Sequence, residues 1–155
     1  MASFQDAFHK GLEAYESADR ARREILSVFE ECAKQVSTAS GGAIVLSREP
    51  KSRGTEGQES YQALMARPMG APETMGLELG EYKLSPHGYP VSLVYAGVDE
   101  YCHDKPSLEQ ALVELLGHPV TGGKLRRLMD LHAKRKSLTG GTPPQTDGGQ
   151  NGKAE

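Results

Sequence analysis

The stretch from Leu77 to Tyr95 reads LELGEYKLSPHGYPVSLVY, and its pattern decides the fold. Apolar and polar residues alternate on both sides of its centre, which indicates β-strands with one buried face. Gly80 shifts the phase of this alternation, which indicates a β-bulge. The segment Ser85-Pro86-His87-Gly88 is a turn signal, so we expect the two halves to form an antiparallel hairpin.

Further strands are expected on both sides of this hairpin. One is predicted at 43–48 and a second at 60–67, with a loop rich in proline, glycine and charge at 49–57 between them. A last short strand is predicted at 100–103, after a turn at 96–99. The middle of the chain therefore predicts a four- or five-stranded, mainly antiparallel sheet.

An apolar seam runs along the N-terminal part of the chain and predicts one long amphipathic helix. Its members recur three and four residues apart: Phe4, Phe8, Gly11, Tyr15, Ala18, Arg22, Ile25, Phe29, Cys32 and Val36. Such a helix would be roughly 50 Å long, whereas a domain of this size is only about 30 Å across. We expect it either to bend near Gly11 or Ser17 or to project and meet a partner. As a dimer element it would use Phe4, Phe8, Tyr15, Ile25 and Phe29.

Two shorter helices are predicted after the sheet. Ser107-Leu108-Glu109-Gln110 reads as a capping box at the start of the first, and Gly117, His118 and Pro119 end it. A second follows at about 121–136. From Thr139 onward no apolar residue larger than alanine appears, so residues 139–155 are predicted to be a disordered tail. The whole chain is expected to be a single α+β domain over 1–138 with this tail attached.

Composition and charge indicate a soluble, folded protein. The 155 residues are 37% hydrophobic with a net charge of -3, which is too weakly charged for a disordered chain. No apolar run approaches the roughly 18 residues that a membrane helix needs, and the N-terminus lacks the layout of a signal peptide. We therefore expect a cytoplasmic protein with no membrane partner. The two cysteines, Cys32 and Cys102, have no disulfide or zinc-binding pattern.

The sequence carries no recognised catalytic or cofactor motif, so we expect no enzyme activity, no cofactor and no metal. Tyr101-Cys102-His103-Asp104 alone brings a thiol, an imidazole and a carboxylate together. Neighbouring side chains on a strand point to opposite faces, so Cys102 and His103 would not form a catalytic pair. A thiol hydrolase built on a reactive Cys102, with a distant partner such as His87 or His118, stays a third hypothesis.

Acidic residues gather in one part of the chain. Residues 73–109 hold seven acidic and two basic residues, a local charge of -5. We expect an acidic partner-binding surface with interleaved tyrosines, formed by Glu78, Glu81, Tyr82, Asp99, Glu100 and Tyr101. Acidic groups steer a basic partner and tyrosines anchor it, as in small inhibitors of basic proteins. The alternative is that these charges only keep the strands soluble and protect the sheet edge.

Basic residues gather near the C-terminal end instead. Residues 124–136 hold six basic residues and one acidic residue, a local charge of +5, so the rest of the chain carries -8. The candidate phosphate-binding residues are Arg126, Arg127, Lys134, Arg135 and Lys136. This segment has no aromatic residue and the domain is acidic overall, so nucleic-acid binding by a regulator ranks second. The first hypothesis is a small non-enzymatic protein that binds a macromolecular partner with a basic surface, as an inhibitor, immunity-type neutraliser or adaptor.

Overall fold

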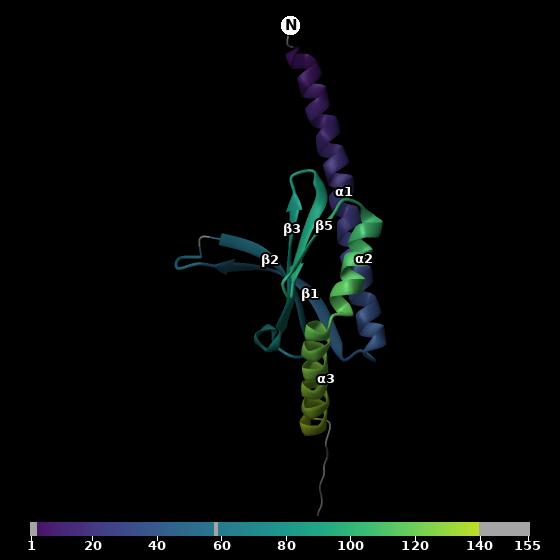
Figure 1. Ribbon diagram of the computed structural model, residues 1–155, viewed down its shortest axis with the longest axis vertical. Coiled ribbons are helices and arrows are strands. Elements are labelled where there is room, and N and C mark those ends of the chain that lie inside the picture. The colour runs from purple at the N-terminus through teal and green to yellow at the C-terminus, as the bar shows by residue number, and fades with distance from the viewer. Residues whose placement is uncertain (1–2, 58, 140–155) are drawn as a thin grey trace, which may run out of the picture.

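The computed structural model describes residues 3–57 and 59–139. It has the predicted α+β fold: a long N-terminal helix, an antiparallel sheet and two C-terminal helices (Figure 1). The elements are α1 (Phe4–Ala39), β1 (Ile44–Arg53), β2 (Glu59–Pro68), the short 3-10 helix η1 (Glu73–Met75), β3 (Leu77–Ser85), β4 (Gly88–Tyr95), β5 (Val98–Cys102), α2 (Lys105–Leu116) and α3 (Pro119–Thr139). The tail predicted to be disordered lies outside the described residues, except for Thr139, which ends α3.

The five strands follow one another across the sheet in chain order, and every neighbouring pair is antiparallel. The predicted turn is confirmed, because Ser85 pairs with Gly88. The predicted bulge is also confirmed. Leu64 pairs with Gly80 and Met65 with Glu78, which leaves Leu79 as the extra residue on β3.

The predicted loop at 49–57 is wrong in its first half, because β1 continues to Arg53. Glu49 pairs with Ala63 and Arg53 with Glu59, so β1 and β2 form a long hairpin that extends away from the helices (Figure 1). Pro50 signalled a loop in the sequence, but it lies on an edge strand. An edge strand accommodates proline at positions whose backbone N–H would face away from the neighbouring strand.

One face of the sheet, the inner face, packs against the helices. Its buried residues are Ile44, Leu46, Leu64, Ala66, Tyr82, Val91, Leu93, Tyr95 and Cys102. The helices complete the same core with Ile25, Val28 and Phe29 from α1, Leu108, Ala111, Leu112 and Leu115 from α2, and Leu128 from α3. The residues that alternate with the sheet's core positions form the opposite, outer face.

Helix α2 begins three residues earlier than the sequence suggested. Asp104 is the N-cap, and its carboxylate accepts a 3.0 Å hydrogen bond from the Ser107 N–H. The Ser107 hydroxyl in turn accepts a hydrogen bond from the Asp104 N–H at 3.1 Å. Pro106 fits the first turn, where no N–H is needed, so the helix starts ahead of the predicted capping box at Ser107.

The turn between β3 and β4 lies directly against α1. The Tyr89 hydroxyl donates a 2.7 Å hydrogen bond to Glu24, and Arg22 donates one of 3.1 Å to the Pro86 carbonyl. Gly88 has a φ of +96°, and a Cβ at this position would lie 2.6 Å from the Ala21 Cβ. Glycine is therefore required here both by the backbone conformation and by the close approach of the helix.

Candidate binding surfaces

The first part of α1, Phe4 to Ser17, is a helical arm in which every residue is exposed. Burial begins only at Ala18, which is 6% exposed. The helix is continuous, without an end at Gly11 or Ser17. Figure 1 shows the arm extending beyond the sheet and the other helices. The sequence left open whether this long helix bends or projects, and in the structure it projects.

The arm carries a stripe of large apolar side chains in water. Phe4 is 86% exposed, Phe8 56%, Leu12 52% and Tyr15 65%. These four residues recur at spacings of four, four and three, which places them on one side of the helix. Clustered exposed apolar residues of this kind mark interaction sites rather than ordinary surface.

The other two residues predicted for self-association, Ile25 and Phe29, lie in the core. They are 2% and 3% exposed, and the Phe29 ring packs 4.7 Å from the ring of Tyr82. The prediction that they form a contact with another chain is therefore wrong, because the chain's own sheet covers them. Leu12 is an exposed residue of the stripe that the sequence reasoning missed, since it lies one position outside the seam.

The six residues predicted as an acidic surface are divided between the two faces of the sheet. The register aligns Glu81 with Val94 and Asp99 on the outer face. Glu78, opposite Met65, and Tyr101, opposite Ser92, also lie on this face. Both Tyr82 and Glu100 pair with Leu93, a core residue, so they lie on the inner face. The expectation that all six share one surface is wrong, because adjacent strand residues alternate between faces.

The outer-face acidic residues have partners within the chain. Arg53 forms a 2.6 Å ion pair with Glu81, and its guanidinium lies 4.0 Å from the centre of the Tyr61 ring. The Tyr61 hydroxyl donates a 3.1 Å hydrogen bond to the carboxylate of Glu78. These contacts occupy Glu78 and Glu81 and leave them less available to a partner protein.

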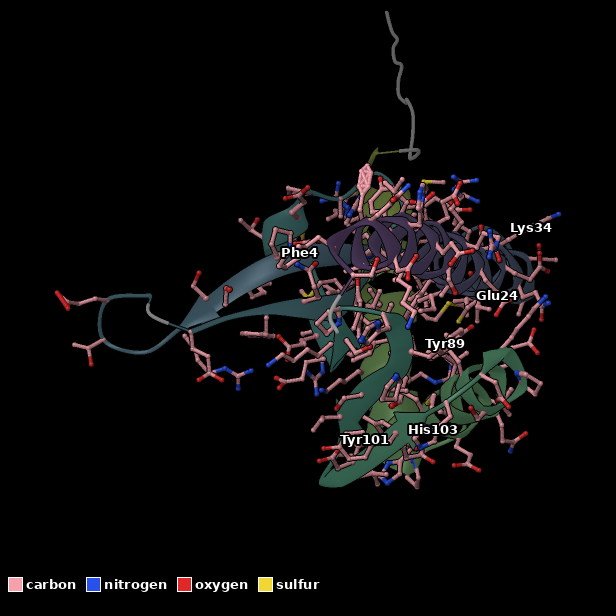
Figure 2. All side chains as sticks on the ribbon, turned by 90° about the horizontal axis from the view of Figure 1, so that it is seen from above. Phe4, Glu24, Lys34, Tyr89, Tyr101 and His103 are labelled. Atoms are coloured by element: carbon pink, nitrogen blue, oxygen red, sulfur yellow. The ribbon has the colours of Figure 1, made fainter. Side chains whose placement is uncertain are left out.

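Basic side chains are interleaved with the acidic ones on this face. The register places Lys51, Arg67 and Lys83 on the outer face together with Glu49. The outer face is thus mixed in charge rather than acidic. Its exposed members near the β5 edge are Asp99 and Tyr101, and Tyr101 is 64% exposed (Figure 2).

Glu100 belongs to a cluster between the inner face and α2. Its carboxylate accepts a 3.1 Å hydrogen bond from the Tyr95 hydroxyl and lies close to Glu114. Burial and the neighbouring Glu114 carboxylate raise the pKa of Glu100 above its ordinary value of 4.5. Burial, with the hydrogen bond to Glu100, raises the pKa of Tyr95 to about 12. This cluster joins β5 to α2, so Glu100 does not belong to the predicted acidic surface on the outer face.

Cys102 has the properties of a core residue. It is 1% exposed, and burial raises the pKa of its thiol to about 11, helped by Glu100, Asp104 and Glu114. A catalytic thiol needs the opposite shift. His103 on the next position is exposed and labelled in Figure 2. The structure therefore speaks against Cys102 as a nucleophile.

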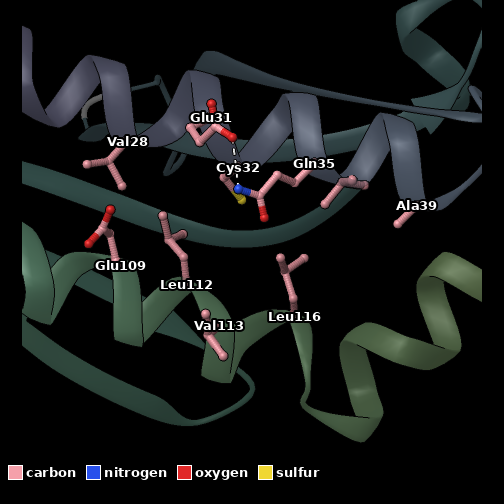
Figure 3. Close-up of a pocket in the computed structure, with 10 residues that line it drawn as sticks. Val28, Glu31, Cys32, Gln35, Ala39, Glu109, Leu112, Val113 and Leu116 are labelled. Carbon is pink, nitrogen blue, oxygen red and sulfur yellow. Dashed lines mark hydrogen bonds between the residues drawn. The ribbon is translucent and has the colours of Figure 1, made fainter.

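An apolar groove of about 360 Å³ runs between α1 and α2 (Figure 3). Its apolar lining comes from Val28, Cys32, Val36, Leu112, Val113 and Leu116. Val113 at its mouth is 62% exposed. Burial raises the pKa of the Cys32 thiol to about 11. The sequence reasoning did not identify this groove, because it depends on how the two helices pack.

The basic residues of α3 have different roles. Lys124 donates a 2.7 Å hydrogen bond to the Glu78 carbonyl, and Arg135 donates one of 3.4 Å to the Gly70 carbonyl. Lys124 thus attaches α3 to β3, and Arg135 attaches it to the segment between β2 and β3. The predicted phosphate-binding residues with exposed side chains are Arg126, Arg127, Lys134 and Lys136.

Within residues 3–57 and 59–139, no three histidine, cysteine, aspartate or glutamate side chains gather where they could hold a metal ion. In the same part of the chain, none of the helices has the length and apolar character needed to cross a membrane. Comparisons of this chain with protein-family models, with curated proteins and with solved structures found no match.

Proposed function

We propose that the protein is a small, cytoplasmic, non-enzymatic binding protein, of the inhibitor, neutraliser or adaptor class, whose main binding element is the arm of α1. The observation that carries this proposal is the stripe of Phe4, Phe8, Leu12 and Tyr15 on the arm of α1, which contributes no residue to the core. A helix of roughly 14 residues is marginally stable in water without tertiary packing. A partner that covers the stripe would supply the missing stabilisation.

The charge pattern of the arm supports the same proposal. Asp6, Lys10, Glu13 and Glu16 lie away from the stripe, so the arm is amphipathic although it packs on nothing. Amphipathic helices bind partners by placing their apolar side in a groove or against another helix. Aromatic side chains at such contacts carry most of the binding free energy.

The β5 edge of the outer face supports a second, weaker contact. Asp99 and Tyr101 are exposed there and combine a carboxylate with an aromatic anchor. Such a pair suits the basic surface of a protein partner, in keeping with the charge-based prediction. The raised pKa of both thiols also favours a binding protein over a thiol hydrolase.

The experiment is a pull-down from cells of the source organism with the full tagged chain and two matched variants. The stripe variant carries Phe4→Ser, Phe8→Ser and Tyr15→Ser. The control variant carries Lys10→Ala and Glu13→Ala, which change exposed residues on the polar side of the arm. We expect a stoichiometric macromolecular partner to be lost from the stripe variant and kept by the control, while both retain the unchanged chain's urea midpoint. Identical binding by all three proteins would refute the arm as the binding element.

The second candidate function is a nucleic-acid-associated regulator. Arg126, Arg127 and Lys134 support it, because their side chains are exposed on α3. Phosphate binding releases counterions, so affinity for a fluorescent duplex or single strand should fall steeply as salt rises. Arg126→Ala with Arg127→Ala should flatten this salt dependence. Absence of binding to DNA and RNA at low salt would remove this candidate.

A further inference from the structure

One face of α1 continues unchanged from the core to the tip of the arm. The residues of this face form three rows along the helix, and within each row they are spaced seven residues apart. The rows are Phe4, Gly11, Ala18 and Ile25; Ala7, Ala14, Ala21 and Val28; and Phe8, Tyr15, Arg22 and Phe29. From Ala18 onward the chain's own sheet and helices cover this face except at Arg22, which is exposed, and before Ala18 the whole face is exposed. The arm therefore has the same kind of apolar face as the core half of α1, but no other described part of the chain packs against it.

Each large side chain on this face has a small side chain at the same distance on the other side of Gly11. Phe4 lies seven residues before Gly11, and Ala18 lies seven residues after it. Two arms that cross antiparallel at Gly11 would therefore place each aromatic residue of one against a small residue of the other. The pairs of exposed residues are Phe8 with Ala14, Tyr15 with Ala7, and Gly11 with its own copy, while Phe4 would end beside Ala18, which its own chain leaves only 6% exposed. Helices pack well when large side chains of one fill the spaces over small residues of the other.

The length of the arm matches this register. The span from Phe4 to Ala18 is about 21 Å at 1.5 Å per residue. An incoming Phe4 would thus reach the point where burial begins, at Ala18, and pack against the β3–β4 turn, since Gly88 lies beside the Ala18 carbonyl. In this register the whole arm contacts its copy, and the two sheets lie at opposite ends of the helix pair.

The area is sufficient for a reversible dimer. Phe4, Phe8 and Tyr15 are 86%, 56% and 65% exposed. At about 200 Å² per aromatic side chain, they offer roughly 400 Å² per chain and about 800 Å² across the pair. The exposed small residues of the face, Ala7, Gly11 and Ala14, add to this and bring the total closer to the roughly 1,000 Å² expected of a specific interface. The face also carries no charge between Phe4 and Ala18, so pairing buries no ion.

We infer that the arm binds a second copy of this chain, as an antiparallel helix pair centred on Gly11. This inference rests on the proposed function, since it names the partner that the arm takes. The resulting dimer holds two sheets apart, with each outer face and β5 edge open to other molecules.

The first test measures the mass of the full chain by sedimentation equilibrium over a wide concentration range. We expect a concentration-dependent rise from 16.7 kDa to twice that value. The variant with Phe8→Ser and Tyr15→Ser should stay a folded monomer, whereas Glu13→Ala with Glu16→Ala should dimerise as the unchanged chain does. A monomer at every concentration would overturn the inference.

The second test determines the register by disulfide formation between single-cysteine substitutions in the arm. Gly11→Cys should link rapidly to its own copy, because its side chain has open space around it and the two Cα atoms come within disulfide range in this register. Phe4→Cys should not link to itself, while a mixture of Phe8→Cys and Ala14→Cys should give the mixed dimer. The native thiols are buried or half-buried with raised pKa values and should react slowly.

The outcomes separate this inference from the proposed function. Rapid self-linking of Phe4→Cys would indicate a parallel pair and overturn the antiparallel register. A monomer whose stripe still captures another macromolecule would refute self-pairing and leave the proposed function standing. A monomer whose stripe variant loses no binding would refute both.

Discussion

Replacing Gly88 by alanine should destabilise the fold strongly, because two independent costs meet at this residue. Its φ of +96° is unfavourable for any residue with a Cβ, at a cost of about 1–2 kcal/mol. The new Cβ would also lie 2.6 Å from the Ala21 Cβ, and overpacking of this kind costs about 1–3 kcal/mol. Together they predict a loss of roughly 2–5 kcal/mol in the free energy of unfolding, a large part of the ~5–15 kcal/mol of a typical domain.

Gly97→Ala is the matched control. Gly97 has a φ of +80°, but its Cβ would meet nothing within 4 Å. It should therefore show only the conformational cost of about 1–2 kcal/mol. Urea unfolding followed by circular dichroism measures both variants, and an m-value of about 1–3 kcal/mol per molar converts midpoints into free energies. If Gly88→Ala is no more destabilising than Gly97→Ala, α1 does not approach the β3–β4 turn as closely as described.

Two further predictions concern titratable groups. Glu100→Gln should raise the urea midpoint near neutral pH, because the raised pKa of Glu100 means that its ionised form opposes folding. The gain should shrink as the pH falls through the folded-state pKa toward 4.5, and a gain that persists in acid would contradict this origin. Cys102 should be alkylated slowly in the folded protein and rapidly in urea, since burial raises the pKa of its thiol to about 11. Equal rates in both states, followed by mass spectrometry of the labelled peptide, would restore the hydrolase hypothesis.

The architecture was predictable because its signals are local. The turn before Gly88 and the phase shift at Gly80 both report backbone geometry within a few residues, and both predictions are confirmed. The start of α2 was not predicted, because Asp104 and Ser107 both fit an N-cap pattern. Only the reciprocal hydrogen bonds between these two residues show which of them caps the helix.

The binding surfaces were less predictable because they depend on register and on tertiary contacts. Glu81 and Tyr82 are neighbours in sequence but lie on opposite faces, and the bulge at Leu79 changes which residues share a face with Glu78. Phe8 and Phe29 occupy equivalent positions on the same helical seam, yet one is exposed and the other is core. Sequence periodicity identifies the seam but does not indicate how far along it the sheet reaches.

The continuity of α1 through Ala18 has a mechanical consequence. The arm and the core half are one continuous helix, so the direction in which Phe8 points is set by the packing of Ile25 and Phe29 several turns away. One residue inserted near Ser17 would turn the stripe by about 100° without touching it. The packing of the core therefore sets the direction of the arm, and a partner bound to the arm lies at a fixed angle to the sheet.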